Sequence, residues 1–282
     1  MDGSTLVAAL RAGSPVIGTL VVSPSPHWPA AVATLGLDFV FIDTEHMALD
    51  RAQLAWMCRA YGAMGMAPIV RIPSPDPFQA TMALDGGARG VIVPYVERAD
   101  EVRRLVGAVK LRPLKGRVLQ DALFEGAPLP DRLQAYLDDA NAGHALIVNV
   151  ESRPALDALD DILAVEGLDA VLVGPHDLSC SLGVPEAYDH PSFLEAVDDI
   201  IDRARRRGIG VGVHAFDPAM AELELGWIRR GANLIVHSTD LRSFVAAMRP
   251  RLAAIRAAVG APAEDAGVPA EGAGHVAAID PI

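Results

Sequence analysis

Lysine, cysteine and long apolar runs are scarce in this chain of 282 residues, and each scarcity argues against one class of chemistry or structure. Lysine occurs only at Lys110 and Lys115, in a polar stretch that we expect to be a loop. An enzyme that works through a Schiff base needs a buried lysine in its active site, so this chemistry is disfavoured. The two cysteines, Cys58 and Cys180, are too few and too scattered for a disulfide framework.

Charge and hydropathy narrow the class of protein further. The formal net charge of −12 argues against a surface for nucleic acid, which needs a basic face. No apolar run reaches the roughly 18 residues of a membrane span, and the first residues lack the pattern of a secretory signal. With 51% hydrophobic and 21% charged residues, the chain fits a globular, cytoplasmic protein with a large core.

Short β-like runs alternate with amphipathic stretches along most of the chain, which predicts an α/β fold, the (β/α)₈ TIM barrel. The predicted strands are Val16–Val22, Asp38–Ile42, Pro68–Arg71, Gly90–Val93, Ala145–Val150, Asp169–Val173, Ile209–Val213 and Asn233–Val236. The predicted helices include Asp50–Met64, Asp76–Gly86, Ala99–Val109, Phe193–Arg207, Pro218–Arg230 and a final one near Ser243–Val259.

Two segments depart from this rhythm. Residues 110–144 are too long for a simple connection, and we expect them on the rim where barrel active sites form, as a lid or a contact with a neighbouring subunit. Residues 260–282 are rich in Ala, Pro and Gly and lack apolar periodicity, which predicts a disordered tail. The barrel domain is therefore expected over residues 1–259.

Two carboxylates, Glu151 and Asp177, follow the predicted fifth and sixth strands. In a parallel barrel, groups at the carboxyl ends of the strands converge on one rim, where ligands bind. Mg²⁺-type cations commonly use one or two carboxylates together with water and substrate. The pair therefore suggests an open metal site that holds a small oxyacid, although either residue alone is equally explained as a helix N-cap.

Other strand ends carry further candidates. His46 is the natural proton-transfer group because imidazole titrates near neutrality, with a solvated loop histidine as the alternative. Arg71 would either pair with a rim carboxylate or clamp an anionic substrate. The turn that contains Gly174, Pro175 and His176 offers backbone amides for a carboxylate at a helix start, which beside a metal would suit a 2-oxo acid.

Six phrases then occur in a fixed order along the chain. They are Ile-Asp-x-Glu-His at 42–46, Val-Arg-x-Pro at 70–73, Leu-Asp-x-Gly-Ala at 84–88, Val-Pro-x-Val at 93–96, Glu-Ser-x-x-Ala-Leu at 151–156 and Gly-Pro-x-Asp-Leu-Ser at 174–179. Over residues 14–250 the chain resembles the HpcH/HpaI aldolase family, the metal-dependent class II pyruvate aldolases. The resemblance implies a modified TIM barrel in a homo-oligomer, usually a hexamer (a trimer of dimers or a dimer of trimers), with a terminal helix exchanged between subunits.

The resemblance also implies a role for each matching residue. Glu151 and Asp177 would be the ligands of a divalent cation (Mg²⁺, Mn²⁺ or Co²⁺), and Arg71 would contact the keto or enolate oxygen. His46 would be the base, acting through water and oriented by Asp85 of an adjacent subunit. Without the resemblance, Asp85 is a turn or cap residue at the wrong end of its own barrel. Asn149, Gly174, Pro175 and His176 would line the 2-oxo acid.

Three features depart from the family pattern. Asn149 stands where many relatives carry Gln or another longer polar residue, and the usual Gly-x-Arg-Gly phrase is altered over residues 115–120. His214 and His237, at the ends of the seventh and eighth strands, are not a family hallmark. They are either hydrogen-bonded rim histidines or groups that recognise the aldehyde half of the substrate or assist protonation.

Together these patterns predict reversible cleavage of a 4-hydroxy-2-oxo acid to pyruvate, or a close 2-oxo acid, and an aldehyde through a metal-stabilised enolate. One alternative is a CoA-thioester lyase of the citrate-lyase-β or malyl-CoA type, for which no basic patch for the CoA phosphates stands out. The other is a catalytically silent barrel that binds 2-oxo acids. Small molecules, with neither nucleic acid nor membrane, are the expected partners.

Overall fold

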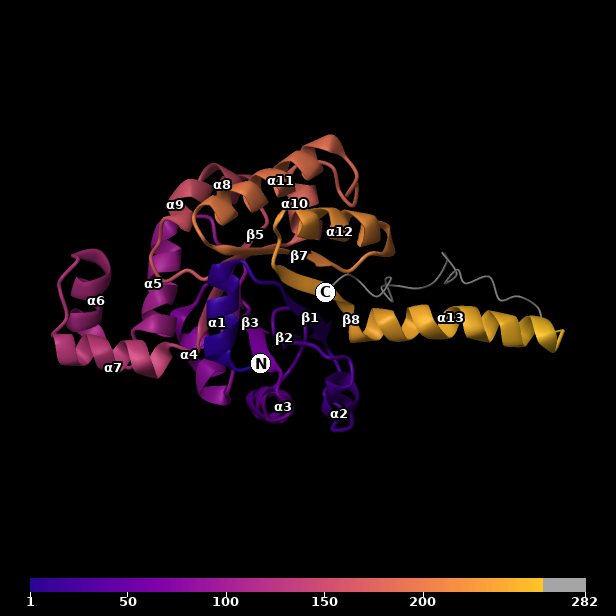
Figure 1. The fold of residues 1–282 in the computed structure, drawn as a ribbon, viewed down its shortest axis with the longest axis horizontal. Coiled ribbons are helices and arrows are strands. Elements are labelled where there is room, and N and C mark those ends of the chain that lie inside the picture. Colours follow the sequence, from indigo (N-terminus) through magenta and orange to yellow (C-terminus); the bar gives the residue numbers. More distant parts are fainter. Residues whose placement is uncertain (261–282) are drawn as a thin grey trace.

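The computed structural model describes residues 1–260 and contains a closed barrel of parallel strands in chain order, with helices around it (Figure 1). The predicted (β/α)₈ fold is thereby confirmed. The strands are β1 Val16–Val21, β2 Phe39–Asp43, β3 Ala67–Arg71, β4 Gly90–Val93, β5 Ala145–Val150, β6 Ala170–Val173, β7 Gly210–Ala215 and β8 Leu234–Thr239. The predicted tail, apart from Gly260, lies outside the described residues.

The helices follow the strands, with additional short ones in the connections. They are α1 Gly3–Ala12, α2 Trp28–Ala33, α3 Arg51–Ala63, α4 Pro77–Gly86, α5 Ala99–Lys110, α6 Gly116–Phe124, α7 Asp131–Asn141, α8 Arg153–Asp157, α9 Leu159–Leu163, α10 Pro175–Ser181, α11 Pro191–Arg206, the 3₁₀ turn η1 Pro218–Met220, α12 Ala221–Arg230 and α13 Asp240–Ala258.

The alternation of side chains along each strand divides the core into two apolar layers. On β2, Phe41 packs in the layer inside the barrel, whereas Ile42 packs in the layer between the barrel and the helices. Leu6 and Leu10 of α1 are fully buried in the inner layer and close the amino-terminal end of the barrel. The same period of two decides which polar residues at the carboxyl ends face the barrel interior.

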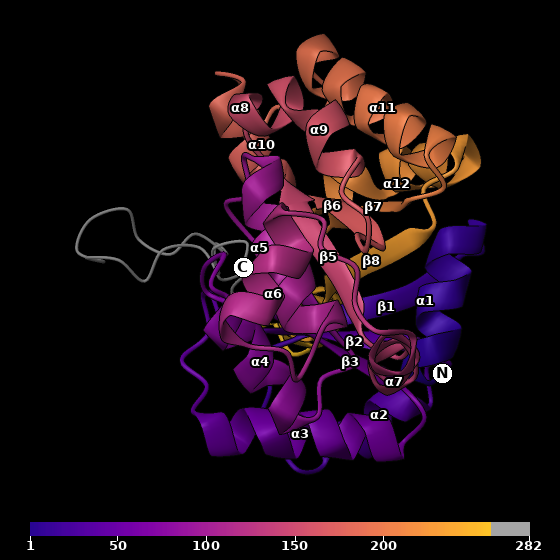
Figure 2. The same cartoon turned by 90° about the vertical axis from the view of Figure 1, so that its left-hand side faces the viewer.

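Residues 110–144 do not lie on the catalytic rim, so their predicted location is wrong. The helix α5 already carries the chain back to the amino-terminal end of the barrel, and α6 and α7 form there against it (Figure 2). Lys110 is the last residue of α5 rather than part of a loop, and its Nζ lies 2.6 Å from Oδ2 of Asp169, just before β6. This lysine is therefore far from the strand ends at which a Schiff base would have to form.

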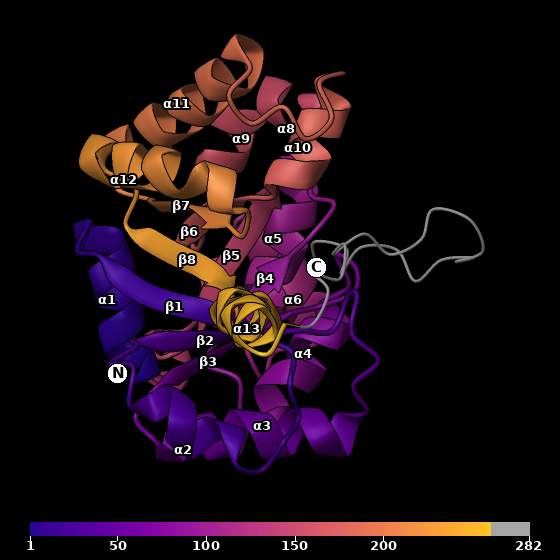
Figure 3. The same ribbon diagram turned by 90° about the vertical axis from the view of Figure 1, so that its right-hand side faces the viewer.

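The helix α13 projects from the barrel as a single rod (Figures 1 and 3). None of its residues is buried, and an apolar stripe along it is exposed, formed by Leu241, Phe244, Met248, Leu252 and Ile255. The outer face of β1 is also open, with Ile17 45% exposed. Neither α13 nor any other helix within residues 1–260 is both long and apolar enough to span a membrane.

Candidate active site

Five buried polar side chains face the barrel interior near the carboxyl ends of their strands. Three of them lie two residues, and one lies four residues, after a residue of the inner apolar layer (Phe41, Ile69 or Ile147). The fifth, on β7, lies between Val213 and Ala215 of the outer layer, so the alternation of the chain directs all five inward. They are Asp43, Arg71, Asn149, Glu151 and His214. Four of these five were predicted from sequence, and Asp43 was quoted only as part of the Ile-Asp-x-Glu-His phrase.

Arg71 is held rigidly at the centre of this group. Its Nε and Nη2 each donate to one carboxylate oxygen of Asp43 at 2.8 Å, and Nε also lies 3.1 Å from Oε2 of Glu45. Its guanidinium lies over the ring of Phe41, 5.3 Å from the centroid. Burial alone would lower the pKa of Arg71, but the hydrogen bond to Asp43 and the nearby carboxylates outweigh it and the pKa is raised. Arg71 therefore presents a fixed positive charge to the site.

Asp43 also shapes the turn that carries His46. Its carboxylate accepts the main-chain N–H groups of Glu45 at 3.0 Å and of His46 at 3.3 Å. The imidazole of His46 remains accessible, with 45% of its side chain exposed, and its Nε2 lies 3.6 Å from Oε2 of Glu45. The predicted proton-transfer residue thus lies beside the Arg71 network, and Asp43 and Glu45 are functional candidates that the sequence reasoning did not single out.

Glu151 and Asp177 surround a common point beside Gly174. A Cβ on Gly174 would lie 2.6 Å from Oε2 of Glu151 and 3.7 Å from Oδ2 of Asp177, so only glycine leaves room there. Burial raises the pKa of Glu151 to about 7, and the charges of Asp177 and Glu45 add to the rise, against hydrogen bonds from Tyr95 and Asn149. The two carboxylates thus form a concentration of negative charge.

A divalent cation fits this pair. A buried carboxylate such as that of Glu151 needs a cationic partner, a proton or a metal, because both of its oxygens accept hydrogen bonds only from neutral groups, whereas Asp177 beside it is exposed. Within residues 1–260, no three His, Cys, Asp or Glu side chains cluster closely enough to hold a metal by themselves. Two carboxylates with the other positions left to water and substrate is the arrangement typical of Mg²⁺, a hard cation that prefers oxygen.

The residues predicted to line the 2-oxo acid adjoin this pair. Asn149 donates from Nδ2 to Oε2 of Glu151 at 2.8 Å, and its buried Oδ1 has no partner among the described residues. Gly174, Pro175 and His176 form the start of α10, the helix that also carries Asp177. Pro175 has no N–H, so the amides available to a substrate carboxylate are those of the residues around it.

The structure does not bring Asp85 and His237 to this group within one chain. Asp85 lies near the end of α4, at the amino-terminal end of the barrel, where its carboxylate pairs with Arg112. His237 points outward from β8, and its Nδ1 lies 2.8 Å from Oε2 of Glu224 on α12. The pKa of His237 is raised, first by that hydrogen bond.

His214, in contrast, lies inside the barrel. Its Nε2 is 3.1 Å from the main-chain carbonyl oxygen of Ser238, and its ring packs edge-on against Phe216. Burial lowers the pKa of His214 to about 4, so the imidazole is neutral at pH 7.

Tyr95, two residues after β4, was not predicted from sequence. Its main-chain N–H donates to Oε1 of Glu151 at 2.8 Å, and its φ of 58° places it in the left-handed region. The Val-Pro-x-Val phrase marks the strand end but gives no sign of either property, because both belong to the backbone rather than to the side chain.

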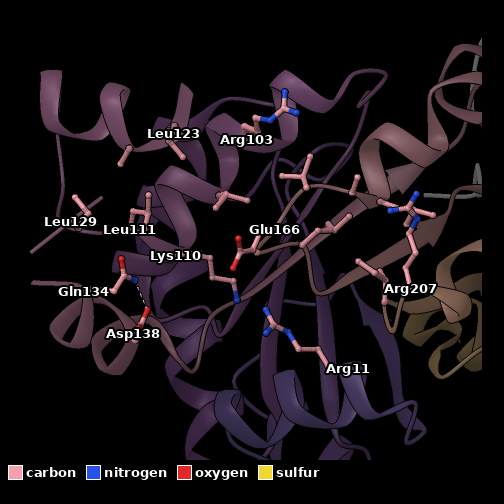
Figure 4. Close-up of a pocket in the computed structure, with 18 of the residues that line it drawn as sticks. Arg11, Arg103, Lys110, Leu111, Leu123, Leu129, Gln134, Asp138, Glu166 and Arg207 are labelled. Carbon is pink, nitrogen blue, oxygen red and sulfur yellow. Dashed lines mark hydrogen bonds between the residues drawn. The ribbon is translucent and has the colours of Figure 1, made fainter. Parts of the chain in front are cut away.

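A large cavity of about 920 Å³ lies at the other end of the barrel, between α5, α6 and the turn before β6 (Figure 4). Four basic residues line it: Arg11, Arg103, Lys110 and Arg207. Arg11 and Lys110 both pair with buried Asp169, and the carboxylate of Glu166 also lines the cavity. Much of the positive charge is thus neutralised within the protein, and the strand-end group remains the candidate site.

Comparison with known proteins identifies the family. The family model of HpcH/HpaI aldolase/citrate lyase matches residues 17–247. The chain belongs to this family. It is 35% identical to the 2-keto-3-deoxy-L-rhamnonate aldolase of Klebsiella pneumoniae, with 86% of this chain and 90% of that protein aligned.

Two solved structures of relatives agree with the observed barrel. One is an HpcH/HpaI aldolase/citrate lyase family protein from Burkholderia cenocepacia, with a TM-score of 0.76, 31% identity and coverage of 90% of this chain and 99% of that one. The other is the citrate synthase SbnG, with a TM-score of 0.77, 29% identity and coverage of 90% and 98%. The predicted family is confirmed.

Proposed function

We propose that this protein is a divalent-metal-dependent aldolase that reversibly cleaves a 4-hydroxy-2-oxo acid to pyruvate, or a close 2-oxo acid, and an aldehyde. The observation that carries the proposal is the pair formed by buried Glu151 and exposed Asp177, on the same rim as Arg71 and His46. For this protein we favour a deoxy sugar acid as the substrate, because its relative from Klebsiella pneumoniae is named 2-keto-3-deoxy-L-rhamnonate aldolase.

Each residue has a distinct part in this proposal. A cation held by Glu151 and Asp177 supplies a Lewis acid for the keto oxygen of the substrate; Mg²⁺, Mn²⁺ and Co²⁺ are the candidates. Arg71, fixed by Asp43, places positive charge where the negative charge of the breaking bond develops, an effect typically worth a few kcal/mol. His46 takes the proton of the 4-hydroxyl group, directly or through water.

The remaining residues bind and orient the substrate. The amides around Gly174, Pro175 and His176 hold its carboxylate at the start of α10. Asn149 offers its unpartnered Oδ1 inside the barrel. His214 is proposed for the aldehyde side because it faces the barrel interior, and the outward direction of His237 makes it the weaker candidate for that role.

The test is release of pyruvate from 4-hydroxy-2-oxo acids by the wild-type protein, before and after removal of metal. We expect activity that is lost with a chelator, is restored by Mg²⁺, Mn²⁺ or Co²⁺, and is absent from the double variant Glu151→Gln/Asp177→Asn. Full activity after rigorous metal removal, or in the double variant, would overturn the proposal. Cleavage of malyl-CoA or citramalyl-CoA instead would assign a thioester lyase, and binding of pyruvate without turnover would assign a silent barrel.

We also propose that the protein is a homo-oligomer, a hexamer, in which α13 packs on a neighbouring subunit. An isolated helix of this length is marginal in water, and tertiary contacts supply most helical stability. The exposed stripe on α13 and the open outer face of β1 and β8, with Ile17 exposed, are complementary apolar surfaces in the same chain. In such an assembly Asp85 of a neighbouring copy would orient His46, as the family resemblance implies.

A further inference from the structure

Tyr95 contacts both halves of the candidate site. Its main-chain N–H donates to Oε1 of Glu151 at 2.8 Å, and its phenol hydroxyl lies beside the carboxylate of Glu45. Glu45 in turn lies 3.1 Å from Nε of Arg71 and 3.6 Å from Nε2 of His46. Tyr95, two residues after β4, thus lies between Glu151 on one side and the group formed by Glu45, Arg71 and His46 on the other.

The backbone of Tyr95 makes this double contact depend on an unusual conformation. Its φ of 58° lies in the left-handed region that non-glycine residues rarely adopt, and such strain persists only where the surroundings hold it. Rotation of φ to the extended region would turn the amide relative to the side chain. The contacts with Glu151 and Glu45 could then not both be kept.

We propose that Tyr95 is a positioning residue for the aldolase reaction, holding Glu151 through its main chain and Glu45 through its phenol. The bond to Oε1 leaves Oε2 of Glu151 directed toward Gly174 and Asp177. The phenol fixes the Glu45 carboxylate between Arg71 and His46. The inference rests on the proposed function, because it concerns the geometry of the same site.

The phenol is tested with Tyr95→Phe, which removes only the hydroxyl group. A hydrogen bond to a charged group commonly accounts for a factor of about ten or more, so we expect kcat for pyruvate release to fall about tenfold. KM and the affinity for Mn²⁺ should remain unchanged. Tyr136→Phe, at an exposed tyrosine of α7, is the matched control. A wild-type kcat in Tyr95→Phe, or a loss of Mn²⁺ affinity as large as the loss of kcat, would overturn this role.

The main chain is tested with Tyr95→Asn and Tyr95→Val, which both lack the phenol. Asn tolerates positive φ, whereas a β-branched residue does not. In calorimetric titration with Mn²⁺, which needs no turnover, Tyr95→Asn should bind as tightly as Tyr95→Phe, and Tyr95→Val about tenfold more weakly. Equal affinities of the Asn and Val variants would overturn the main-chain role.

The wild-type protein separates this inference from the proposed function. If the wild type neither binds Mn²⁺ nor releases pyruvate, the proposed function itself is wrong. If the wild type does both and the Tyr95 variants match it, only the role of Tyr95 is wrong.

Discussion

At the scale of single residues, the geometry of Arg71 sets a requirement that lysine cannot meet. The planar guanidinium holds Asp43 through two parallel bonds and reaches Glu45 with the same Nε. A lysine at this position has one ammonium group and cannot form the paired contact. We predict that Arg71→Lys lowers kcat by about a hundredfold or more, as expected for loss of a fixed charge at a developing oxyanion.

Steady-state kinetics of pyruvate release would check this prediction. Arg117→Lys is the control, because Arg117 pairs with Asp121 at the exposed surface of α6. A kcat for Arg71→Lys within a few-fold of wild type would show that the charge alone, without the bidentate geometry, is sufficient.

His214 makes the stability of the fold depend on pH. Its pKa is lowered to about 4 by burial, whereas a histidine in the unfolded chain titrates near 6.5. The unfolded state therefore binds the proton first, and the contribution of His214 to the free energy of unfolding is fully present above pH 6.5 and is lost as the pH falls toward 4. Between pH 7 and pH 5 this loss amounts to about 2 kcal/mol.

Urea unfolding at pH 7 and pH 5 would measure that loss by comparison with His214→Asn. Between pH 7 and pH 5, we expect the free energy of unfolding of the wild type to fall by about 2 kcal/mol more than that of the variant. The other titrating groups are common to both proteins and cancel in the comparison. Identical pH dependence of the two proteins would show that His214 is not buried in its neutral form.

At the scale of elements, α13 should control assembly. Its apolar stripe carries Phe244 and Leu252, both exposed within one chain. We predict that Phe244→Glu/Leu252→Glu yields monomers, since charge in a buried apolar contact carries a desolvation cost. The control Ala246→Glu/Ala253→Glu adds the same charge on the opposite side of the helix. Light scattering after size-exclusion chromatography would distinguish the two, and an unchanged oligomer in the first variant would exclude α13 from the interface.

Much of the barrel could be predicted from sequence, because buried strands and amphipathic helices have different periods and glycines mark the helix ends. The positions of Glu151 and Arg71 near the strand ends could be predicted for the same reason, because each is a polar residue at the end of an apolar run. His237 shows where this reasoning fails. Its prediction took β8 to end at Val236, but the strand continues to Thr239 and the pleat then directs His237 outward.

Other features had no sequence signal that could have been read. Lys110 was assigned to a loop because its neighbours are polar, whereas its partner Asp169 is distant in sequence and only the folded chain brings them together. The proposed role of Tyr95 depends in part on its main-chain N–H and its φ, which side-chain patterns do not encode.

At the scale of the whole molecule, metal binding should stabilise the fold. A ligand that binds only the folded state at a hundred times its Kd contributes about 3 kcal/mol, which raises Tm by several degrees for a chain of this size. We predict that Mn²⁺ raises Tm in thermal melting, that a chelator reverses the rise, and that Glu151→Gln/Asp177→Asn shows none. An equal rise in the double variant would place the cation elsewhere.

The charges on the barrel rim also have a kinetic consequence. Four carboxyl groups, Asp43, Glu45, Glu151 and Asp177, lie around the guanidinium of Arg71 and give this part of the rim a net negative charge. A 2-oxo acid is itself an anion, and it would meet electrostatic repulsion at this rim until a cation is in place. Addition should therefore be ordered, cation before substrate: the chelated protein should show no calorimetric binding of pyruvate, and its cation affinity should be measurable alone. In such a scheme the supply of free cation, rather than of substrate, would determine how many barrels are able to react.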